Sequence, residues 1–414
     1  MVGRFLIFFA IILVIEIYFL QAVKTFVQDF SQGKKNGILY TAYGLAALNF
    51  ILGLVAMFYP PPNWNNVMRF ITSGLVILAI CKLLGISFLI IDDVIRLFRW
   101  IFSYFKSAPA EGVEVSHKIS RLKFMSQLAI TFTVITAIGF LYGMVKGAYK
   151  YRVHNVKVPS PNLPAAFNGF KIVQISDIHT GSFIDNSALN KAFDIVMQQN
   201  ADLILFTGDL VNNETTETFG FEDTYSRLKA PHGVFSVLGN HDYGDYKQWE
   251  SPLAKVENLN ALKEVHAKAG WRLLMNEHVA IEKNGEKIAL LGIENWGGNM
   301  NFPKYGKMDL AHQGTENYPY KILMSHDPSH WEKQVQPQYP DIDLTLSGHT
   351  HGMQLGIEIP GFRWSPSQWV YKQWAGLYKH GQQFIYVNRG LGFLGYPGRL
   401  GIWPEITVIE LQKV

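Results

Sequence analysis

Residues of the kinds that bind metal ions recur at five points in the second half of the chain, each directly after a run of apolar, β-forming residues. The single cysteine, Cys81, lies in an apolar run, so neither a disulfide framework nor a thiolate metal site can be built. Any metal must therefore take nitrogen and oxygen ligands. The five groups are Asp177 and His179 after FKIVQI, Asp209 after DLILF, Asn240, His241 and Asp242 after GVFSVL, His326 after YKILM, and His349 and His351 after DIDLTL.

These groups can meet only if the runs before them are strands of an α/β arrangement, in which sites form beyond the carboxyl ends of the strands. Between the first two runs, residues 184–200 carry Ala192 and Val196 within a helical spacing of apolar residues, which predicts a crossover helix. Later, Asn284 and Gly285 between two alternating runs predict a hairpin turn. Strands and helices mixed in two halves predict a sandwich of sheets between helices.

The first third of the chain has a different composition. Of 414 residues, 48% are hydrophobic and 17% charged, and the apolar excess lies before about residue 150. Four stretches reach the roughly 20 apolar residues that cross a bilayer: residues 5–23, 38–59, 67–91 and 128–148. The first is too long for a signal peptide and has no small-x-small cleavage site after it. We predict a transmembrane domain over residues 1–149, a linker or edge strand over 150–169, and a second domain over 170–414.

Lysine and arginine in short loops predict the orientation. The turn between spans two and three has no charge, whereas the loops on either side of it are basic; they hold Lys24, Lys34, Lys35, Arg96, Arg99, Lys106, Lys118, Arg121 and Lys123. Both basic loops are thus expected in the cytoplasm, with the chain in the inner (cell) membrane and its second domain extracytoplasmic. Lys146, Lys150 and Arg152 argue the other way, but long translocated domains obey the rule poorly.

Two charged residues, Glu16 and Lys82, fall inside predicted spans at similar depth, where either alone would be costly. We predict a structural ion pair; a transport or proton-relay role is the alternative. Residues 92–106 combine aromatic and basic residues and predict an interfacial helix that starts at Asp92 or Asp93, or simply a helical loop.

In their order, D-x-H, G-D, G-N-H-D, a single histidine after a strand and G-H-x-H resemble the five signature blocks of the calcineurin-like metallophosphoesterases. The resemblance covers nearly all of residues 170–410. A membrane-anchored bacterial branch is similar in its GHTHG block and in a tail like YVNRGLGFLGYPGRLGIWPEITVIEL. The resemblance implies a four-layer α-β-β-α sandwich behind the four transmembrane helices, and an enzyme that hydrolyses a phosphate ester or phosphodiester. Met353 stands where many relatives have a glycine after that block.

The resemblance also implies a pair of divalent metal ions, about 3.5 to 4 Å apart in two-metal sites. Carried over by position, the first ion takes Asp177, His179, Asp209 and His351, and the second takes Asp209 as a bridge with Asn240, His326 and His349. A metal-bridging hydroxide would attack phosphorus, and His241, oriented by Asp242, would protonate the leaving oxygen. Manganese is the expected metal, with iron or zinc as alternatives. The eight other histidines receive no role: His117, His154, His232, His266, His278, His312, His330 and His380.

The expected substrate is a lipid-linked phosphate, because a membrane anchor suits an ester that is itself in the bilayer. The alternatives are a soluble substrate with the spans as an anchor, and a sensor or transporter with a regulatory domain. Arg389 and Arg399 could bind a substrate phosphate or pair structurally with an acid such as Glu405. The aromatic residues 364–374, with Phe393 and Trp403, suit either a membrane interface or a core. With a net charge of +4 and no dense basic patch, no nucleic-acid partner is expected, and no obligate protein partner is inferred.

Overall fold

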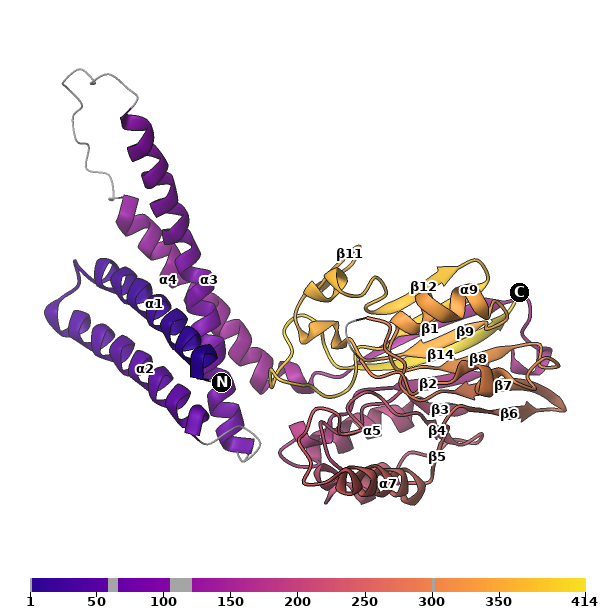
Figure 1. Ribbon diagram of the computed structural model, residues 1–414. Helices are drawn as coiled ribbons and strands as arrows, with labels where there is room; N and C mark the ends of the chain where they lie inside the picture. Colours follow the sequence, from indigo (N-terminus) through magenta and orange to yellow (C-terminus); the bar gives the residue numbers. More distant parts are fainter. Residues whose placement is uncertain (1, 59–65, 105–120, 300–301) are drawn as a thin grey trace. The chain divides into compact units, whose positions relative to one another are not determined.

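A computed structural model describes residues 2–58, 66–104, 121–299 and 302–414 (Figure 1). The chain divides into two compact units, Met1–Tyr142 and Gly143–Val414. The long helices of the first part are α1 (Val2–Phe26), α2 (Gln32–Phe58), α3 (Asn66–Ser103) and α4 (Arg121–Val145). All four are long and apolar enough to cross a bilayer. The four predicted spans are confirmed as helices.

The predicted ion pair in the helical unit is also confirmed. Lys82 Nζ lies 2.6 Å and 2.8 Å from the two carboxylate oxygens of Glu16, and both side chains are buried. The amide of Asn49 donates a third hydrogen bond to Glu16 at 3.1 Å. Three helices, α1, α2 and α3, therefore contribute to one polar contact inside an apolar bundle.

The separate interfacial helix predicted for residues 92–106 is wrong. Helix α3 runs without interruption over 38 residues to Ser103, because the apolar periodicity and helix formers continue past Asp92. That aspartate is buried in the helix interior rather than capping a new helix. Its carboxylate contacts the side chains of Arg96 and Arg121, each at 2.5 Å, which compensates its charge. Lys106, His117 and Lys118 lie outside the described residues.

The second unit contains two six-stranded sheets and a small hairpin. One sheet has the order β1-β14-β2-β3-β4-β5 and the other β12-β13-β9-β8-β7-β6. The strands of the first sheet are β1 (Arg152–Ser160), β2 (Lys171–Ile175), β3 (Leu203–Phe206), β4 (Val234–Ser236), β5 (Trp271–Leu273) and β14 (Glu405–Lys413). Those of the second are β6 (Glu277–Lys283), β7 (Glu286–Gly292), β8 (Lys321–Met324), β9 (Leu344–Ser347), β12 (Gly376–His380) and β13 (Gln383–Val387). The hairpin is β10 (Ile357–Ile359) with β11 (Phe362–Trp364).

Alternating side chains of these strands build three apolar layers, as the period of two in a strand requires. Ile172 packs between the sheets, whereas its neighbour Val173 faces the helices outside the first sheet. In the second sheet Ile322 faces the other sheet and Leu323 faces outward. The outer helices are α5 (Ser187–Gln198), α6 (Glu222–Tyr225), α7 (Pro252–Lys268), α8 (Met308–His312) and α9 (Gln336–Gln338). The predicted four-layer sandwich is confirmed.

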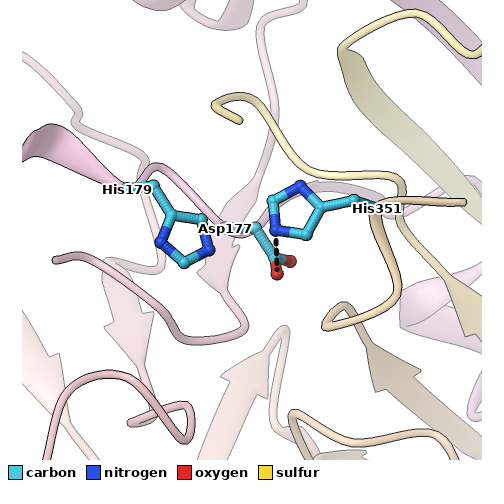
Figure 2. Close-up of side chains that lie close together, drawn as sticks. All are labelled: Asp177, His179 and His351. Atoms are coloured by element: carbon cyan, nitrogen blue, oxygen red, sulfur yellow. Dashed lines mark ion pairs between the residues drawn. The ribbon is translucent and has the colours of Figure 1, made fainter. Parts of the chain in front are cut away.

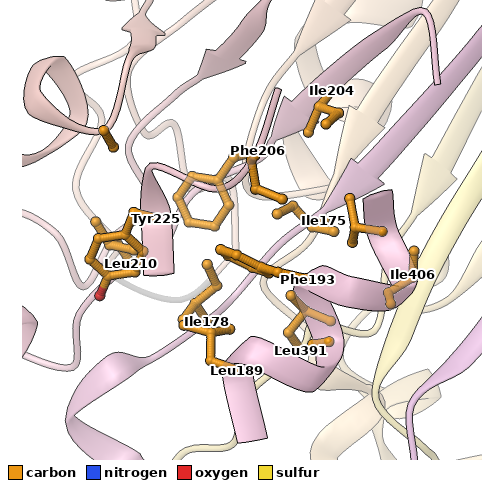
Figure 3. Close-up of a cluster of buried hydrophobic side chains, with 14 of the residues drawn as sticks. Ile175, Ile178, Leu189, Phe193, Ile204, Phe206, Leu210, Tyr225, Leu391 and Ile406 are labelled. Carbon is orange, nitrogen blue, oxygen red and sulfur yellow. The ribbon is translucent and has the colours of Figure 1, made fainter. Parts of the chain in front are cut away.

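Figure 3 shows the outer layer of the first sheet, where Phe193 of α5 packs among Ile175, Phe206 and Ile406. Helix α5 is the crossover helix predicted between the first two strands. The predicted hairpin turn is confirmed as well, since Asn284 and Gly285 both have positive φ, 51° and 83°, between β6 and β7.

Of the two alternatives predicted for residues 150–169, a linker or an edge strand, the edge strand is confirmed. Strand β1 occupies Arg152–Ser160 and pairs in parallel with β14 over its whole length, at the edge of the first sheet. An edge strand is the position in which Pro159 is tolerated, because proline cannot donate to a ladder. The compact unit accordingly begins at Gly143, and the sequence boundary at residue 170 is corrected.

Candidate metal centre

The five strands that precede the metal-binding residues all end at the same edge of the sandwich. Strands β2, β3 and β4 are parallel neighbours in the first sheet, and β8 and β9 are parallel neighbours in the second. Parallel neighbours present their carboxyl ends together. Side chains from distant parts of the sequence therefore meet beyond these ends.

They form two clusters in which the possible ligand atoms lie within 4.8 Å of one another: Asp177 with His179 and His351, and Asp209 with His326 and His349. Figure 2 shows the first cluster, with the imidazoles of His179 and His351 on either side of the Asp177 carboxylate. His351 Nε2 lies 3.2 Å from Asp177 Oδ1.

Asp209 connects the two clusters. Its Oδ2 lies 3.0 Å from His326 Nε2 in its own cluster and 3.6 Å from His179 Nε2 in the other. Asn240 joins the second cluster, since its Oδ1 lies 2.7 Å from His349 Nδ1. The structure thus brings together all seven residues that the sequence predicts as ligands, with the carboxylate of Asp209 in the bridging position.

The backbone at this edge is unusual. Ten non-glycine residues among those described have positive φ, and five of them are Asp177, His179, Asp209, His349 and His351. Such conformations cost of order 1 to 3 kcal/mol each and persist only where the surroundings enforce them. They turn the short segments that follow β2, β3 and β9, so that these side chains point into one space.

Two motif glycines allow the strand ends to approach so closely. A Cβ at Gly239 would lie 2.2 Å from Asp209 Oδ1, and one at Gly348 would lie 2.2 Å from Asp177 Oδ2. Any larger residue would displace a carboxylate. The glycines of the G-N-H-D and G-H-x-H motifs are therefore required for space, not for chemistry.

The residues present fit a pair of cations. The Nε2 atoms of His179, His326 and His351 are buried, and none forms a hydrogen bond of acceptable geometry with any described residue. Buried polar atoms are normally hydrogen-bonded, so a group of exceptions calls for a ligand. Two carboxylates, an amide oxygen and four imidazoles are a donor set that suits divalent cations such as Mn²⁺, Fe²⁺ and Zn²⁺.

Electrostatics points the same way. Burial acts to raise the pKa of Asp177 and Asp209, but the imidazoles of His351 and His326 hold the pKa of both carboxyls below the usual range. Burial lowers the pKa of His179 to about 3, so this ring is neutral and has a free lone pair. The Asp209 carboxylate outweighs the effect of burial on His326 and raises its pKa to about 10. A proton and a cation would compete for that position.

Contacts that the five motifs do not specify hold the candidate ligands in place. His326 Nδ1 lies 2.7 Å from the carbonyl oxygen of Thr207, a contact that leaves Nε2 to face Asp209. Tyr371 Oη lies 2.7 Å from His349 Nε2, and Tyr246 Oη accepts a hydrogen bond of 2.9 Å from the Asn240 amide. Tyr371 lies outside the five motifs, so nothing in the sequence points to it. Tyr246 follows His241 by only five residues, so its position near a motif could have drawn attention to it.

The expected orientation of His241 by Asp242 is wrong. His241 Nδ1 lies 2.8 Å from the carbonyl oxygen of Asn212 instead. The carboxylate of Asp242 accepts hydrogen bonds from four backbone N–H groups, those of Asp209, Leu210, Val211 and Gly239. Burial, with the charge of Asp209, raises the pKa of Asp242 to about 7. Asp242 thus joins the loops after β3 and β4 and positions the backbone of Asp209.

The two arginines are structural. Arg389 is buried and forms ion pairs with Glu405 and, at 2.5 Å, with Glu358, so the pairing alternative is confirmed for it and phosphate binding is not. Arg399 is completely buried, and its guanidinium donates to the carbonyl oxygens of Arg389, Gly390 and Gly392. Its Nη2 also lies 3.1 Å from His351 Nδ1. Most of the guanidinium nitrogens thus have protein partners, whereas Arg389 Nε and Arg399 Nη1 form no hydrogen bond to a described residue.

For part of the aromatic residues 364–374 the core alternative is confirmed. Tyr371 and Trp374 are buried, as is Phe393, whereas Trp369 is 74% exposed. Among the unassigned histidines, His266 and His330 are buried. Met353 is exposed beside His351, and like that ligand it has positive φ.

Comparison with known proteins identifies this arrangement. Residues 170–353 match the family model for the calcineurin-like phosphoesterases, and residues 3–148 match that for a probable calcineurin-like phosphoesterase transmembrane domain. The chain is 30% identical to the uncharacterized metallophosphoesterase YkuE of Bacillus subtilis, over 72% of this chain and 99% of that protein. The chain belongs to the calcineurin-like phosphoesterase family.

Other members of the family extend this assignment. The chain is 29% identical to the phosphodiesterase YaeI of Escherichia coli, over 71% of this chain and 99% of that protein. A Danio rerio transmembrane protein with metallophosphoesterase domain is 32% identical over 68% of this chain, and the match spans 62% of the Danio protein. This calcineurin-like phosphoesterase is therefore a membrane protein, and the sequence-based prediction of a metallophosphoesterase is confirmed.

Proposed function

We propose that this phosphoesterase is a membrane-anchored, dinuclear metal-dependent enzyme that hydrolyses a phosphate ester or phosphodiester of a lipid. The observation that carries the proposal is the position of Asp209, whose carboxylate contacts a histidine of each cluster. Only a carboxylate in such a position can be shared by two cations. Asp177, His179 and His351 complete one ligand set, and Asn240, His326 and His349 complete the other.

Two bound divalent cations supply a nucleophile at neutral pH and positive charge beside the phosphoryl oxygens. The protein does the remaining work. The ionised carboxylates of Asp177 and Asp209 hold the cations, and the buried position of both side chains excludes bulk water from them. Asp242 fixes the backbone of the loop that carries Asp209.

His241 is the candidate general acid. Its backbone N–H donates to Asp209 Oδ1 at 2.9 Å, and its Nδ1 is engaged with the Asn212 carbonyl, which leaves Nε2 to deliver a proton to the leaving oxygen. The ring of Tyr246, 4.7 Å from that of His241 between centroids, restricts its movement. This arrangement supports a catalytic role for His241, which is not one of the proposed ligands.

The lipid substrate, the cell membrane and the extracytoplasmic site belong to the proposal. The family's transmembrane domain supports a substrate in the bilayer, and the basic loops between the spans support the orientation. An outer-leaflet phospholipid or a polyprenyl phosphate fits that orientation. A regulatory domain without activity is disfavoured, because every ligand position of the family pattern is filled.

The test is hydrolysis by the purified full-length protein in detergent, with Mn²⁺, Fe²⁺ or Zn²⁺ added, of bis-nitrophenyl phosphate and of detergent-solubilised lipid esters. We expect two ions per chain by elemental analysis and turnover of both substrates, faster with the lipid. Turnover of the soluble ester alone would favour the soluble-substrate alternative. A protein that holds two ions and hydrolyses neither would contradict the proposal and favour a sensor.

A further inference from the structure

The hairpin β10–β11 lies outside both six-stranded sheets and has two unlike faces. In its register Ile357 pairs with Trp364 and Ile359 with Phe362, so these four side chains share one face. Ile357, Ile359 and Phe362 are 49%, 58% and 52% exposed. This face, which we term the apolar hairpin face, carries no charged residue and packs no large side chain into the core.

The opposite face fastens the hairpin to the domain. Glu358 forms its ion pair with the buried Arg389, and Arg363 donates a hydrogen bond of 3.2 Å to Tyr378 Oη. The guanidinium of Arg363 also lies 5.1 Å from the centre of the Trp374 ring. Because charged groups hold one face of the hairpin against the domain, its apolar face is exposed in a fixed position.

The root of the hairpin adjoins the point at which the chain leaves its last membrane helix. Gly356 N donates to Leu400 O at 2.9 Å, and the next residue back, Arg399, donates its N–H to the carbonyl of Gly143 in the last turn of α4 at 3.1 Å. A Cβ at Gly147 would lie only 2.1 Å from Arg399 O. One short segment, residues 399–400, thus contacts both the hairpin root and the end of α4.

The end of α4 lies close to the end of the last candidate membrane span. The candidate span that begins at Arg121 ends at Tyr149, and Lys150 Nζ lies 4.8 Å from the centre of the Trp403 ring. Paired lysine and tryptophan side chains are typical of the membrane interface. The hairpin root is therefore joined, through residues 399–400, to the residues at which the chain leaves this candidate span.

We propose that the apolar hairpin face docks into the bilayer that α4 crosses. The exposed Trp369, whose ring lies 5.9 Å from that of Trp364, extends the same surface. Burial of exposed apolar area in the acyl region would stabilise this contact. Glu358, the acidic residue of the hairpin, is paired with Arg389 on the opposite face.

The same segment leads from the docked surface to the metal centre. Two residues beyond Trp369, Tyr371 contacts His349, and Thr350 Oγ1 donates to the carbonyl of Trp374. A lipid held at the hairpin would therefore have its phosphate near the second ligand cluster. This consequence rests on the proposed function, whereas docking itself does not.

A fluorescent label tests the docking directly. The full-length protein, with Ile359→Cys labelled by an environment-sensitive dye, is reconstituted in bilayers of phosphatidylcholine and phosphatidylglycerol that contain nitroxide-labelled lipid. Leu253→Cys is the matched control, because Leu253 is also an exposed apolar residue and lies on α7, at the edge of the domain opposite β11 (Figure 1). Background labelling is measured on the unsubstituted chain, in which the single cysteine, Cys81, is buried.

We expect a blue-shifted emission and nitroxide quenching at position 359, and neither at position 253. Equal quenching at the two positions would overturn the proposal. A blue shift at 359 without quenching would overturn it too, because it would indicate that a second copy, rather than lipid, covers the face.

A triple variant tests the consequence for catalysis. Replacing Ile357, Ile359 and Phe362 by serine should lower turnover of a bilayer-borne phosphate ester about tenfold, a factor that corresponds to about 1.4 kcal/mol, and leave turnover of bis-nitrophenyl phosphate unchanged. The control, Leu253→Ser with Val256→Ser, should change neither. An equal loss on both substrates would show that the hairpin supports the metal centre instead, and would overturn this inference. If the unsubstituted protein hydrolyses nothing, the proposed function fails, while the quenching result still decides the docking.

Discussion

The helical unit and the sandwich both bury charged and polar groups, but they satisfy them differently. In the helical unit Glu16 accepts hydrogen bonds from Lys82 and Asn49, and the pair neutralises itself. In the sandwich three histidines direct buried Nε2 atoms toward carboxylates without forming hydrogen bonds to any described residue. The first arrangement is complete within the protein, whereas the second requires a cation.

The comparison teaches that burial of a polar group does not by itself indicate function. His266 is buried with an unpartnered Nε2, yet its Nδ1 contacts only Ser236 and no carboxylate lies among the groups that shift its pKa. A metal site needs several buried nitrogen atoms that lack a hydrogen-bond partner and that converge on ionised carboxylates. Substitutions can distinguish buried groups that are paired within the protein from buried groups that bind a cation.

The largest effect is expected from Asp209→Asn, which removes the charge shared by the two clusters. A metal centre contributes several kcal/mol to the transition state, and each 1.4 kcal/mol is tenfold in rate, so hydrolysis of bis-nitrophenyl phosphate should fall on the order of 10³-fold. Elemental analysis should show fewer than two ions per chain. Asp194→Asn, a surface acid paired with Arg227, is the control and should retain both activity and metal. Full activity in the Asp209 variant would show that the buried polar groups of the sandwich do not depend on the Asp209 charge for catalysis.

Glu16→Gln tests the self-sufficient pair. An ammonium left without its partner in a buried site costs about 3 to 5 kcal/mol, so thermal unfolding of the detergent-solubilised helical unit should begin at a clearly lower temperature. Asp29→Asn, which breaks an exposed pair with Lys123 in the same unit, should cost about 1 kcal/mol or less.

The exchange of the two charges sharpens this result. The double variant Glu16→Lys with Lys82→Glu keeps the ion pair, and the Asn49 amide can turn its oxygen toward the new ammonium. It should recover most of the lost stability. Absence of any recovery would show that the pair has a role beyond mutual neutralisation, such as a relay.

Tyr371→Phe should have a smaller effect on the metal centre. Loss of a hydrogen bond to a ligating histidine typically weakens metal affinity 10- to 100-fold, and Tyr371 Oη is the partner of His349 Nε2. Titration with a chelator measures the change. Tyr305→Phe removes a tyrosine hydroxyl that contacts Asp245 rather than a ligand, and should leave the titration unaltered.

The smallest effect concerns the buried histidine without carboxylates. Burial lowers the pKa of His266 from its ordinary value of 6.5 to about 3. Between these pH values the unfolded chain binds a proton that the folded chain does not, so stability rises with pH through this window and falls on acidification, by up to about 1.4 kcal/mol per pH unit. In His266→Gln this share of the pH dependence should vanish. Denaturation midpoints at pH 7 and pH 5 test it, and an unchanged difference would contradict the assignment.

Much of the architecture could be predicted because local signals agreed with one another. Apolar length identified the four membrane helices, and strand runs followed by Asp177, Asp209 or His349 identified the metal ligands. The misplaced features were those without a local signal. Asp92 lies inside helix α3 with its charge compensated by Arg96 and by Arg121, and the second of these partners comes from α4. The partner of His241 is a backbone carbonyl, which no side-chain pattern can encode.

The order and types of residues alone predicted a membrane part and an α/β sandwich, since these follow from apolar length and periodicity. The resemblance of five short motifs to a known family supplied the seven candidate ligands. Only the tertiary structure decided which charged side chains pair with groups of the protein itself. Arg389 pairs with the buried Glu405, and Arg399 donates hydrogen bonds to backbone carbonyl groups. The aromatic residues 364–374 lie partly in the core and partly at an exposed surface. The physical reason is that desolvation and pairing depend on what the fold brings alongside a residue, and the neighbours in sequence do not specify that.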